Sequence, residues 1–153
     1  NVMSIMLNRM LQGKQPIIYG DGKQQRCFSY IDDCLYCLNA LAFQDNVVGE
    51  VINIGPDEEP ITINELAEAC ANETGLNLDP IHHKDRPKEV KLAVCSSDKA
   101  RELLGYSTAT NMRQSVKKTA EYIRTRGTKK FQYHLPLEII NDQTPDTWKK
   151  KLI

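Results

Sequence analysis

The sequence predicts an α/β fold in which short strands alternate with amphipathic helices. Several segments repeat apolar residues at helical spacing, and most of them end beside a glycine. Between these segments lie short apolar or β-branched runs that are bounded by turn residues. This alternation through 153 residues is typical of a single α/β domain, with a tail attached where the pattern fades.

The amino-terminal segment predicts a helix, a strand and a turn. The helix covers residues 2–11, and Gly13 suits the position just beyond its end. Its apolar stripe consists of Val2, Ile5, Met6, Met10 and Leu11. Pro16–Tyr19 then predicts a strand that stops at the tight turn Gly20–Gly22.

The next segment predicts two strands around a second helix. One strand is expected over Cys27–Ile31 and the other over Glu50–Ile54, before Gly55 and Pro56. Between them, Asp32 or Asp33 can cap a helix by accepting a hydrogen bond from a free backbone N–H. The residues expected to face inward from this helix are Leu35, Leu38, Leu41 and Ala42.

The clearest helix start is a capping box at Thr62–Glu65, in which each side chain can satisfy a free backbone donor. The helix behind it carries one apolar face and stops at Gly75. That face consists of Ile63, Leu66, Ala67 and Cys70, at the i, i+3, i+4, i+7 spacing.

The remaining elements are two strands and two helices. The strands are expected over Leu78–His82 and Lys91–Val94. One helix starts at Ser96 or Ser97 and stops at Gly105, with Ala100, Leu103 and Leu104 along it. The other starts at Asn111 and ends before Gly127, with Met112, Val116, Ala120 and Ile123 inward.

The pattern fades after Gly127, so we expect a domain over residues 1–127 and a tail or arm over 128–153. Five residues of the tail are expected to dock on another surface: Leu135, Leu137, Ile139, Ile140 and Trp148.

Charge and composition exclude several classes of protein. The 20 Lys+Arg balance the 20 Asp+Glu, so no basic excess indicates a nucleic-acid partner or an anionic membrane surface. No apolar run approaches the roughly 18 residues of a spanning helix, and no signal sequence is visible. The chain opens with Asn1, which predicts a piece of a longer protein.

Five cysteines at irregular spacing favour a reducing, cytoplasmic location with inert thiols. Cys34 and Cys37 form a C-x-x-C, but no second pair accompanies them as a zinc site would require. We therefore interpret both as core or half-buried thiols.

No residue pattern by itself marks a catalytic centre or a metal site. His82 and His83 are consecutive, so on a strand they point to opposite faces and cannot chelate one ion together. Tyr19 and Lys23 match Y-x-x-x-K, but the glycines between them break the helix that this pair needs. The turn Gly20–Gly22 is too short for a dinucleotide-binding motif.

Two arginines beside turns remain as candidates for ligand-binding residues. Arg26 follows the glycine turn, and Arg86 precedes Pro87, which stiffens the backbone next to the guanidinium. An arginine fork suits phosphate oxygens, and a nearby carboxylate can accept bonds from sugar hydroxyls. Taken alone, each residue is explained more simply as a solvated surface charge.

The run Gly20–Asp33, GDGKQQRCFSYIDD, resembles the G-D-G-x-Q-x-R-x-F-x-Y-V-D-D run of NAD-dependent sugar-nucleotide epimerases and dehydratases. These enzymes are the extended short-chain dehydrogenases/reductases. Further segments resemble the same family in the same order: Gly49–Gly55, Thr62–Ala67, Arg86–Val90 and Ser97–Tyr106. The resemblance covers about residues 1–126.

The resemblance implies that the chain is the small C-terminal substrate-binding lobe of such an enzyme, with the Rossmann core largely missing. The family's counterparts of Arg26 and Arg86 contact the nucleotide diphosphate, and that of Glu89 bonds the ribose. The backbone around Ile17, Ile18 and Tyr19 lies against the base. The chain departs from the family at Cys27, where Asp is frequent, and at Lys88-Glu89, where Gly-Asp is frequent. No catalytic residue is expected within it.

The resemblance also implies a nucleotide-diphosphate sugar as substrate, with a UDP-sugar favoured, and NAD as cofactor of the full-length enzyme. The bound NAD takes a hydride from the sugar ring, commonly at C4. The family's NAD-binding turn and its catalytic Tyr-x-x-x-Lys precede this region, so the chain alone is expected to bind poorly and to be inactive.

Epimerase, dehydratase and decarboxylase activities stay open for the parent enzyme, as does a homodimer of the full-length protein. The alternative function is a non-catalytic interaction module that kept the family fold and docks through its tail.

Overall fold

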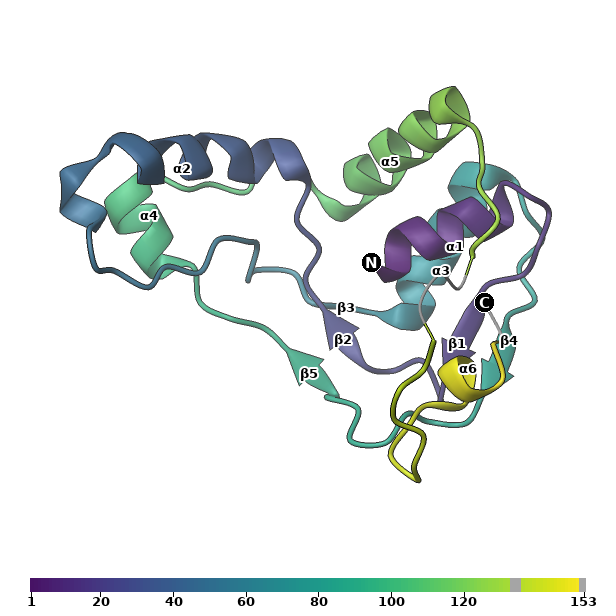
Figure 1. The fold of residues 1–153 in the computed structure, drawn as a ribbon. Coiled ribbons are helices and arrows are strands. Elements are labelled where there is room, and N and C mark those ends of the chain that lie inside the picture. Colours follow the sequence, from purple (N-terminus) through teal and green to yellow (C-terminus); the bar gives the residue numbers. More distant parts are fainter. Residues whose placement is uncertain (133–135, 152–153) are drawn as a thin grey trace.

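The computed structural model describes residues 1–132 and 136–151, in which short strands lie between helices (Figure 1). The predicted α/β class is confirmed. The elements in chain order are α1 (Val2–Met10), β1 (Ile17–Tyr19), β2 (Gln25–Arg26), α2 (Ile31–Phe43), the 3₁₀ turn η1 (Asp45–Val47), β3 (Ile61–Thr62), α3 (Ile63–Thr74), β4 (Ile81–His83), β5 (Leu92–Ala93), α4 (Asp98–Leu104), α5 (Met112–Arg126) and α6 (Asp146–Lys149).

Helices α1, α3 and α5 pack together with β1 around the larger hydrophobic core (Figure 1). Helix α3 begins with the predicted capping box. The Thr62 hydroxyl accepts from the Glu65 N–H at 3.1 Å, and the Glu65 carboxylate accepts from the Thr62 N–H at 2.7 Å. The predicted apolar face of α3 is buried, and so are Val116, Ala120 and Ile123 of α5. These two helix predictions are confirmed.

Two small sheets join distant parts of the chain. Strand β1 pairs in parallel with β4, with Ile17 opposite Ile81 and Tyr19 opposite His83. Strand β2 lies between β3, which is antiparallel to it, and β5, which is parallel to it. Strand β4 lies parallel to β1, and strand β5 lies parallel to β2. The loop that joins β4 to β5 (residues 84–91) therefore runs from the end of β1 to the start of β2.

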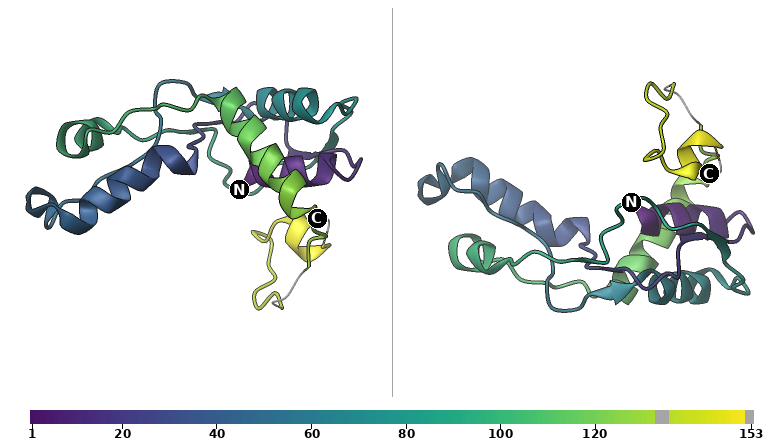
Figure 2. Two further views of the ribbon diagram at one scale, coloured as in Figure 1. Left: turned by 90° about the horizontal axis from the view of Figure 1, so that it is seen from above. Right: turned by 90° about the horizontal axis from the view of Figure 1, so that it is seen from below.

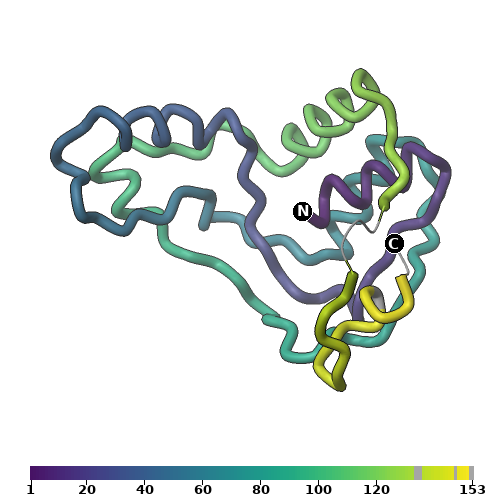
Figure 3. Tube along the Cα trace, viewed as in Figure 1, coloured from purple at the N-terminus to yellow at the C-terminus, as the bar shows by residue number. Residues whose placement is uncertain are grey.

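Four strand predictions need correction. Residues 27–30 are not a strand, because β2 lies earlier, at Gln25–Arg26. Residues 50–54 have strand-like sequence but pair with no strand of the described residues. Figure 3 shows the trace of this segment, which belongs to the connection between α2 and α3. Strand β4 is shifted toward the carboxyl terminus, and strand β5 is shorter than predicted. In both, only the residues that lie opposite β1 or β2 form ladder bonds.

A second, smaller core lies at the other end of the molecule, where α2 and α4 meet η1 (Figure 2). Helix α2 begins at Ile31, so Asp32 and Asp33 are not its caps. Instead Asp33 is buried, and its carboxylate accepts hydrogen bonds from the backbone N–H and hydroxyl of Thr110 at 2.9 and 2.8 Å.

The predicted inward face of α2 is wrong. Leu35 and Leu38 are each 51% exposed, Ala42 is exposed and Leu41 is half-buried. The buried residue of the central turn is Cys37, which belongs to the small core with Val47 of η1 and with Ala100 and Leu104 of α4.

All five cysteines are free thiols. Cys34 is half-buried and Cys37 is buried, as predicted. Burial raises the pKa of the Cys70 thiol to about 12, which makes this core thiol unreactive. Each helix in the described part of the chain is too short or too polar to span a membrane.

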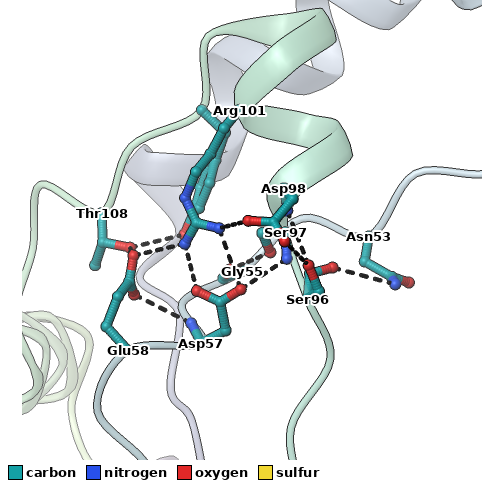
Figure 4. A network of polar contacts seen from close by, with 10 residues as sticks. Asn53, Gly55, Asp57, Glu58, Ser96, Ser97, Asp98, Arg101 and Thr108 are labelled. Carbon is teal, nitrogen blue, oxygen red and sulfur yellow. Dashed lines mark hydrogen bonds and ion pairs between the residues drawn. The ribbon is translucent and has the colours of Figure 1, made fainter.

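A polar network ties the loop at residues 55–58 to the start of α4 (Figure 4). The Arg101 guanidinium contacts the carboxylates of Asp57, Glu58 and Asp98. Asp57 also accepts a hydrogen bond from the Ser97 N–H at 2.8 Å. These donors lower the pKa of Asp57 to about 2, so the network requires its ionised form.

The arm is anchored to the body at Lys129, and residues of its 142–149 segment line a cavity together with Tyr19 and the 84–87 loop. The Asn8 side chain on α1 donates to the Lys129 carbonyl at 2.8 Å and accepts from the Lys129 N–H at 3.0 Å. Figure 2 shows residues 136–151 of the arm beyond α1. Ile139, Ile140 and Trp148 are exposed within this chain, so the prediction that they dock on another surface stays a prediction, whereas Leu137 is half-buried. Leu135 lies outside the described residues.

Truncating the core of α3 tests the difference between the two helix faces. We expect Leu66→Ala, at a fully buried position, to lower the free energy of unfolding by about 2–5 kcal/mol. The matched change Leu38→Ala, on the exposed face of α2, should alter it by no more than about 0.5 kcal/mol. Urea denaturation measures both. Similar losses in the two variants would contradict the packing described above.

Acid should weaken the Asp57 network. Because folding lowers the pKa of Asp57, its contribution to stability is present above the ordinary carboxyl pKa and is lost as the pH falls toward about 2. We expect the unfolding free energy of Asp57→Asn to be lower near neutral pH and to fall less steeply between about pH 4 and 2. The control is Asp79→Asn, an exposed acid outside the network. Parallel pH profiles for Asp57→Asn and the wild type would contradict this role.

Candidate functional site

A cavity of about 320 Å³ lies between the amino-terminal half of α1, the strands β1 and β2, and the 84–91 loop. Five of the six predicted site residues line it: Ile17, Tyr19, Arg26, Arg86 and Glu89. The sixth, Ile18, is 1% exposed within the larger core, because alternate residues of a strand face opposite sides. The strand pairing thus brings Arg26 and Arg86 to one cavity, although sixty positions separate them in the sequence.

Arg26 is fixed by two acceptors at the edge of the cavity. Its guanidinium donates to the Glu89 carboxylate at 2.6 Å and to the Gln25 carbonyl at 2.7 Å. The side chains of Arg26 and Glu89 keep 25% and 16% of their exposure, so the pair is only partly screened by water. The second oxygen of Glu89 makes no hydrogen bond to the described residues, which leaves an acceptor for a bound molecule.

Arg86 is placed by an aromatic ring. Its guanidinium carbon lies 4.2 Å from the centre of the Tyr19 ring, within range of a cation–π contact. The His83 ring lies on the same tyrosine, with 5.9 Å between ring centres. Arg86 forms no ion pair with a carboxylate in the described part of the chain. It lines this cavity and also a neighbouring one, which contains Asp142 and Asp146 of the arm.

The loop that carries Arg86 and Glu89 turns tightly. The Glu89 N–H donates to the Arg86 carbonyl at 3.3 Å, which closes a four-residue turn around Pro87 and Lys88. Lys88 has φ of +57°, a left-handed conformation that favours glycine. The family pattern has Gly at this position, so the departure noted in the sequence places a lysine where the backbone is strained.

The cavity also contains residues that sequence reasoning missed. Arg9 and Gln24 line it; Gln24 is the glutamine of the G-D-G-x-Q-x-R run but was assigned no role, and no motif distinguished Arg9. Gln24 is 5% exposed, and its amide donates to the Tyr19 carbonyl at 3.1 Å. Its Oε1 is the single buried side-chain oxygen or nitrogen without a partner among the described residues. Only the fold shows that both residues face this cavity, Arg9 from α1 and Gln24 from the segment just before β2.

The lining is electropositive overall. Three arginines against one glutamate leave a formal charge of two positive units. The apolar part of the wall comes from Val2, Ile5, Met6, Ile17 and Ile63. A ligand with an anionic end and a flat, less polar end therefore complements this cavity.

The residues that the structure describes contain no cluster of metal-ligating side chains, and Tyr19 and Lys23 do not form a helical pair. No group of three His, Cys, Asp or Glu side chains converges there. The His82 ring nitrogen Nδ1 lies 3.0 Å from the Gly20 carbonyl, and His83 packs on Tyr19, so each histidine has a structural partner. Tyr19 ends β1 and Lys23 follows the glycine turn, which rules out the helical spacing of a Tyr-x-x-x-Lys pair.

The turn Gly20–Gly22 does not have the geometry of a dinucleotide-binding turn. Binding of a dinucleotide pyrophosphate needs a glycine-rich turn that opens a helix. The turn Gly20–Gly22 leads instead into strand β2. It is held against α3, because the Asn64 amide donates to the Asp21 carbonyl at 2.9 Å.

Comparison with known proteins identifies the family. The family model of GDP-mannose 4,6-dehydratase matches residues 1–119. The chain belongs to this family. A putative UDP-glucose 4-epimerase from Methanocaldococcus jannaschii is 32% identical over 80% of the chain and 39% of its own length. A UDP-N-acetyl-α-D-glucosaminuronate decarboxylase from Bacillus cytotoxicus is 30% identical over 80% of the chain and 40% of its own length.

Solved structures of GDP-mannose 4,6-dehydratase family relatives have the same fold. The UDP-glucuronic acid 4-epimerase from Bacillus cereus, in complex with UDP-glucuronic acid and NAD, matches with a TM-score of 0.76 and 30% identity. The match covers 83% of this chain and 40% of that one. The UDP-glucose 4-epimerase from Thermotoga maritima, with UDP-glucose, matches with a TM-score of 0.73 and 31% identity over 82% of this chain and 40% of that one.

The resemblance to sugar-nucleotide epimerases and dehydratases is therefore confirmed. The chain spans about 40% of the length of these relatives.

Restoring the family's glycine should relieve the turn that carries Arg86 and Glu89. A left-handed conformation costs a non-glycine residue about 1–2 kcal/mol, which the greater flexibility of unfolded glycine partly offsets. We expect Lys88→Gly to raise the free energy of unfolding by about 0.5–1 kcal/mol in urea denaturation. Lys84→Gly, at a neighbouring position without positive φ, should lower it. A stability of Lys88→Gly at or below that of the wild type would contradict a strained turn.

Proposed function

We propose that the cavity binds the nucleoside diphosphate of a sugar nucleotide, with a UDP-sugar favoured. The observation that carries the proposal is the convergence of Arg26 and Arg86 on one cavity with a surplus of two positive charges. A diphosphate brings about two negative charges, and guanidinium groups bind phosphate oxygens at short, directed distances.

Each predicted residue has a distinct role in this proposal. Arg86, without a carboxylate partner in the described chain, meets the diphosphate directly. Arg26 donates to the same group while its bond to Glu89 fixes its direction. The free oxygen of Glu89 accepts from a ribose hydroxyl, and the backbone of Ile17–Tyr19 lies along the base.

The chain's position in a larger enzyme is the second part of the proposal. Ile31, Leu35 and Leu38 recur at i, i+4, i+7 on α2, and each is more than half exposed. Such a stripe is unusual on a free surface and typical of an interface. We infer that the NAD-binding and catalytic part of the parent epimerase, dehydratase or decarboxylase covers it, so that this chain holds the nucleotide while the sugar reacts elsewhere.

The alternative, a non-catalytic interaction module, is favoured by one observation. Ile139, Ile140 and Trp148 expose apolar surface along the arm. A module that uses this arm for docking needs no charged cavity, so nucleotide binding separates the two functions.

Calorimetric titration with UDP tests the proposed function. We expect Arg86→Ala to weaken UDP binding by about 1.5–3 kcal/mol, the size of a lost hydrogen bond to a charged group. The matched control is Arg113→Ala, which removes an exposed arginine of α5 outside the cavity and should leave the affinity unchanged. An unchanged affinity in Arg86→Ala would remove this arginine from the site. Absence of UDP binding in the parent protein would favour the interaction module.

A further inference from the structure

A second cavity, of about 510 Å³, lies between α1 and the beginning of the arm. Its charged lining is entirely basic, with no carboxylate among the residues that form it. The five cations are Arg9, Lys14, Arg126, Lys129 and Lys130. The chain as a whole is neutral, so this concentration of one sign is a local feature of the fold.

None of these five cations forms an ion pair within the described chain, whereas Arg101, Lys99 and Arg124 elsewhere all do. The contacts that the five make leave their charge intact. Arg9 donates through Nε to the Gln15 carbonyl at 3.1 Å, so its two terminal nitrogens remain for another acceptor. Like charges gathered without counterions repel one another, and a bound anion relieves that repulsion.

The cavity is held in place by the anchoring of the arm. The side-chain amides of Asn8 and Gln12 donate to the Lys129 carbonyl at 2.8 and 3.2 Å, and Asn8 also accepts from the Lys129 N–H. These bonds fix the backbone at Lys129 beside α1. The five cations supply charged donors to the wall.

We propose that this cavity binds a phosphorylated small molecule at a site separate from the proposed nucleotide site. Phosphate oxygens only accept hydrogen bonds, and they complement a wall of ammonium and guanidinium donors. The volume lies within the range of small-molecule sites. A nucleic acid would need a basic surface that continues beyond the cavity, and the neutral chain gives no sign of one.

The two cavities share part of one wall. Asn1, Ile5 and Arg9 line both, on the same stretch of α1. A phosphate group in the second cavity has two sources: a free phosphorylated molecule, or a sugar nucleotide that reaches across α1. Arg86 lines only the first of these two cavities and Lys129 and Lys130 only the second, so variants separate the sources.

Isothermal titration of the chain with inorganic pyrophosphate at moderate salt tests the site. We expect Lys129→Gln/Lys130→Gln to weaken binding at least five-fold, because two of the five cations are removed. The matched control, Lys23→Gln/Lys117→Gln, removes the same charge from exposed lysines that line neither cavity and should change the affinity less than two-fold. Lys14→Gln, on the loop after α1, repeats the test without touching the arm.

The Arg86→Ala variant decides between the two sources of phosphate. Pyrophosphate binding that persists in Arg86→Ala and weakens in both Lys129→Gln/Lys130→Gln and Lys14→Gln supports a separate site. Binding that is lost in Arg86→Ala and unaffected by the lysine variants would overturn the proposal, because the pyrophosphate would then occupy only the nucleotide cavity. Undetectable binding, or equal weakening by the control pair, would overturn it as well. UDP affinity is a separate readout, so the two proposals fail independently.

Discussion

Two parallel strand pairings create the candidate site. Because β4 runs alongside β1 and β5 runs alongside β2, the loop between β4 and β5 must cross the ends of both earlier strands. That loop carries Arg86 and Glu89, and the strands that it crosses carry Tyr19 and Arg26. The pairing thus brings Tyr19 and Arg26 together with Arg86 and Glu89, although about sixty positions of the sequence lie between the two pairs. Because both sheets are short, the positions of these side chains also depend on the core formed by α1, α3 and α5, which supports β1.

The two arginines of the site differ in their contacts. Arg26 is directed by Glu89 and its charge is partly balanced, whereas Arg86 is supported on an aromatic ring that does not neutralise it. A cavity with two balanced pairs would offer a diphosphate little attraction, and one with two unpaired arginines would be costly to assemble without a ligand. The observed combination keeps one cation fixed and one available.

The sequence predicted local features well and non-local ones poorly. Capping at Thr62 and Asn111 depends on neighbouring residues, so both helix starts were predictable. Strand boundaries failed at residues 50–54 because a strand exists only where a partner lies, and the sequence does not show the partner. The inward face of α2 was predicted wrongly because apolar spacing identifies an apolar stripe on a helix but does not show whether another part of the same chain covers that stripe. Family motifs located Arg26, Arg86 and Glu89. Gln24 also stands at a motif position, but its place in the cavity emerged only from the fold, as did Arg9, which no motif marks.

The central claim, that one cavity holds a nucleoside diphosphate between distant parts of the chain, is tested most directly by nuclear magnetic resonance. The backbone amides of the isotope-labelled chain would be followed during titration with UDP. The account predicts that the largest shifts gather at Tyr19, Arg26, Arg86 and Glu89 together, with one common saturation curve. Shifts confined to one of these segments, or centred on another surface such as α2, would contradict it.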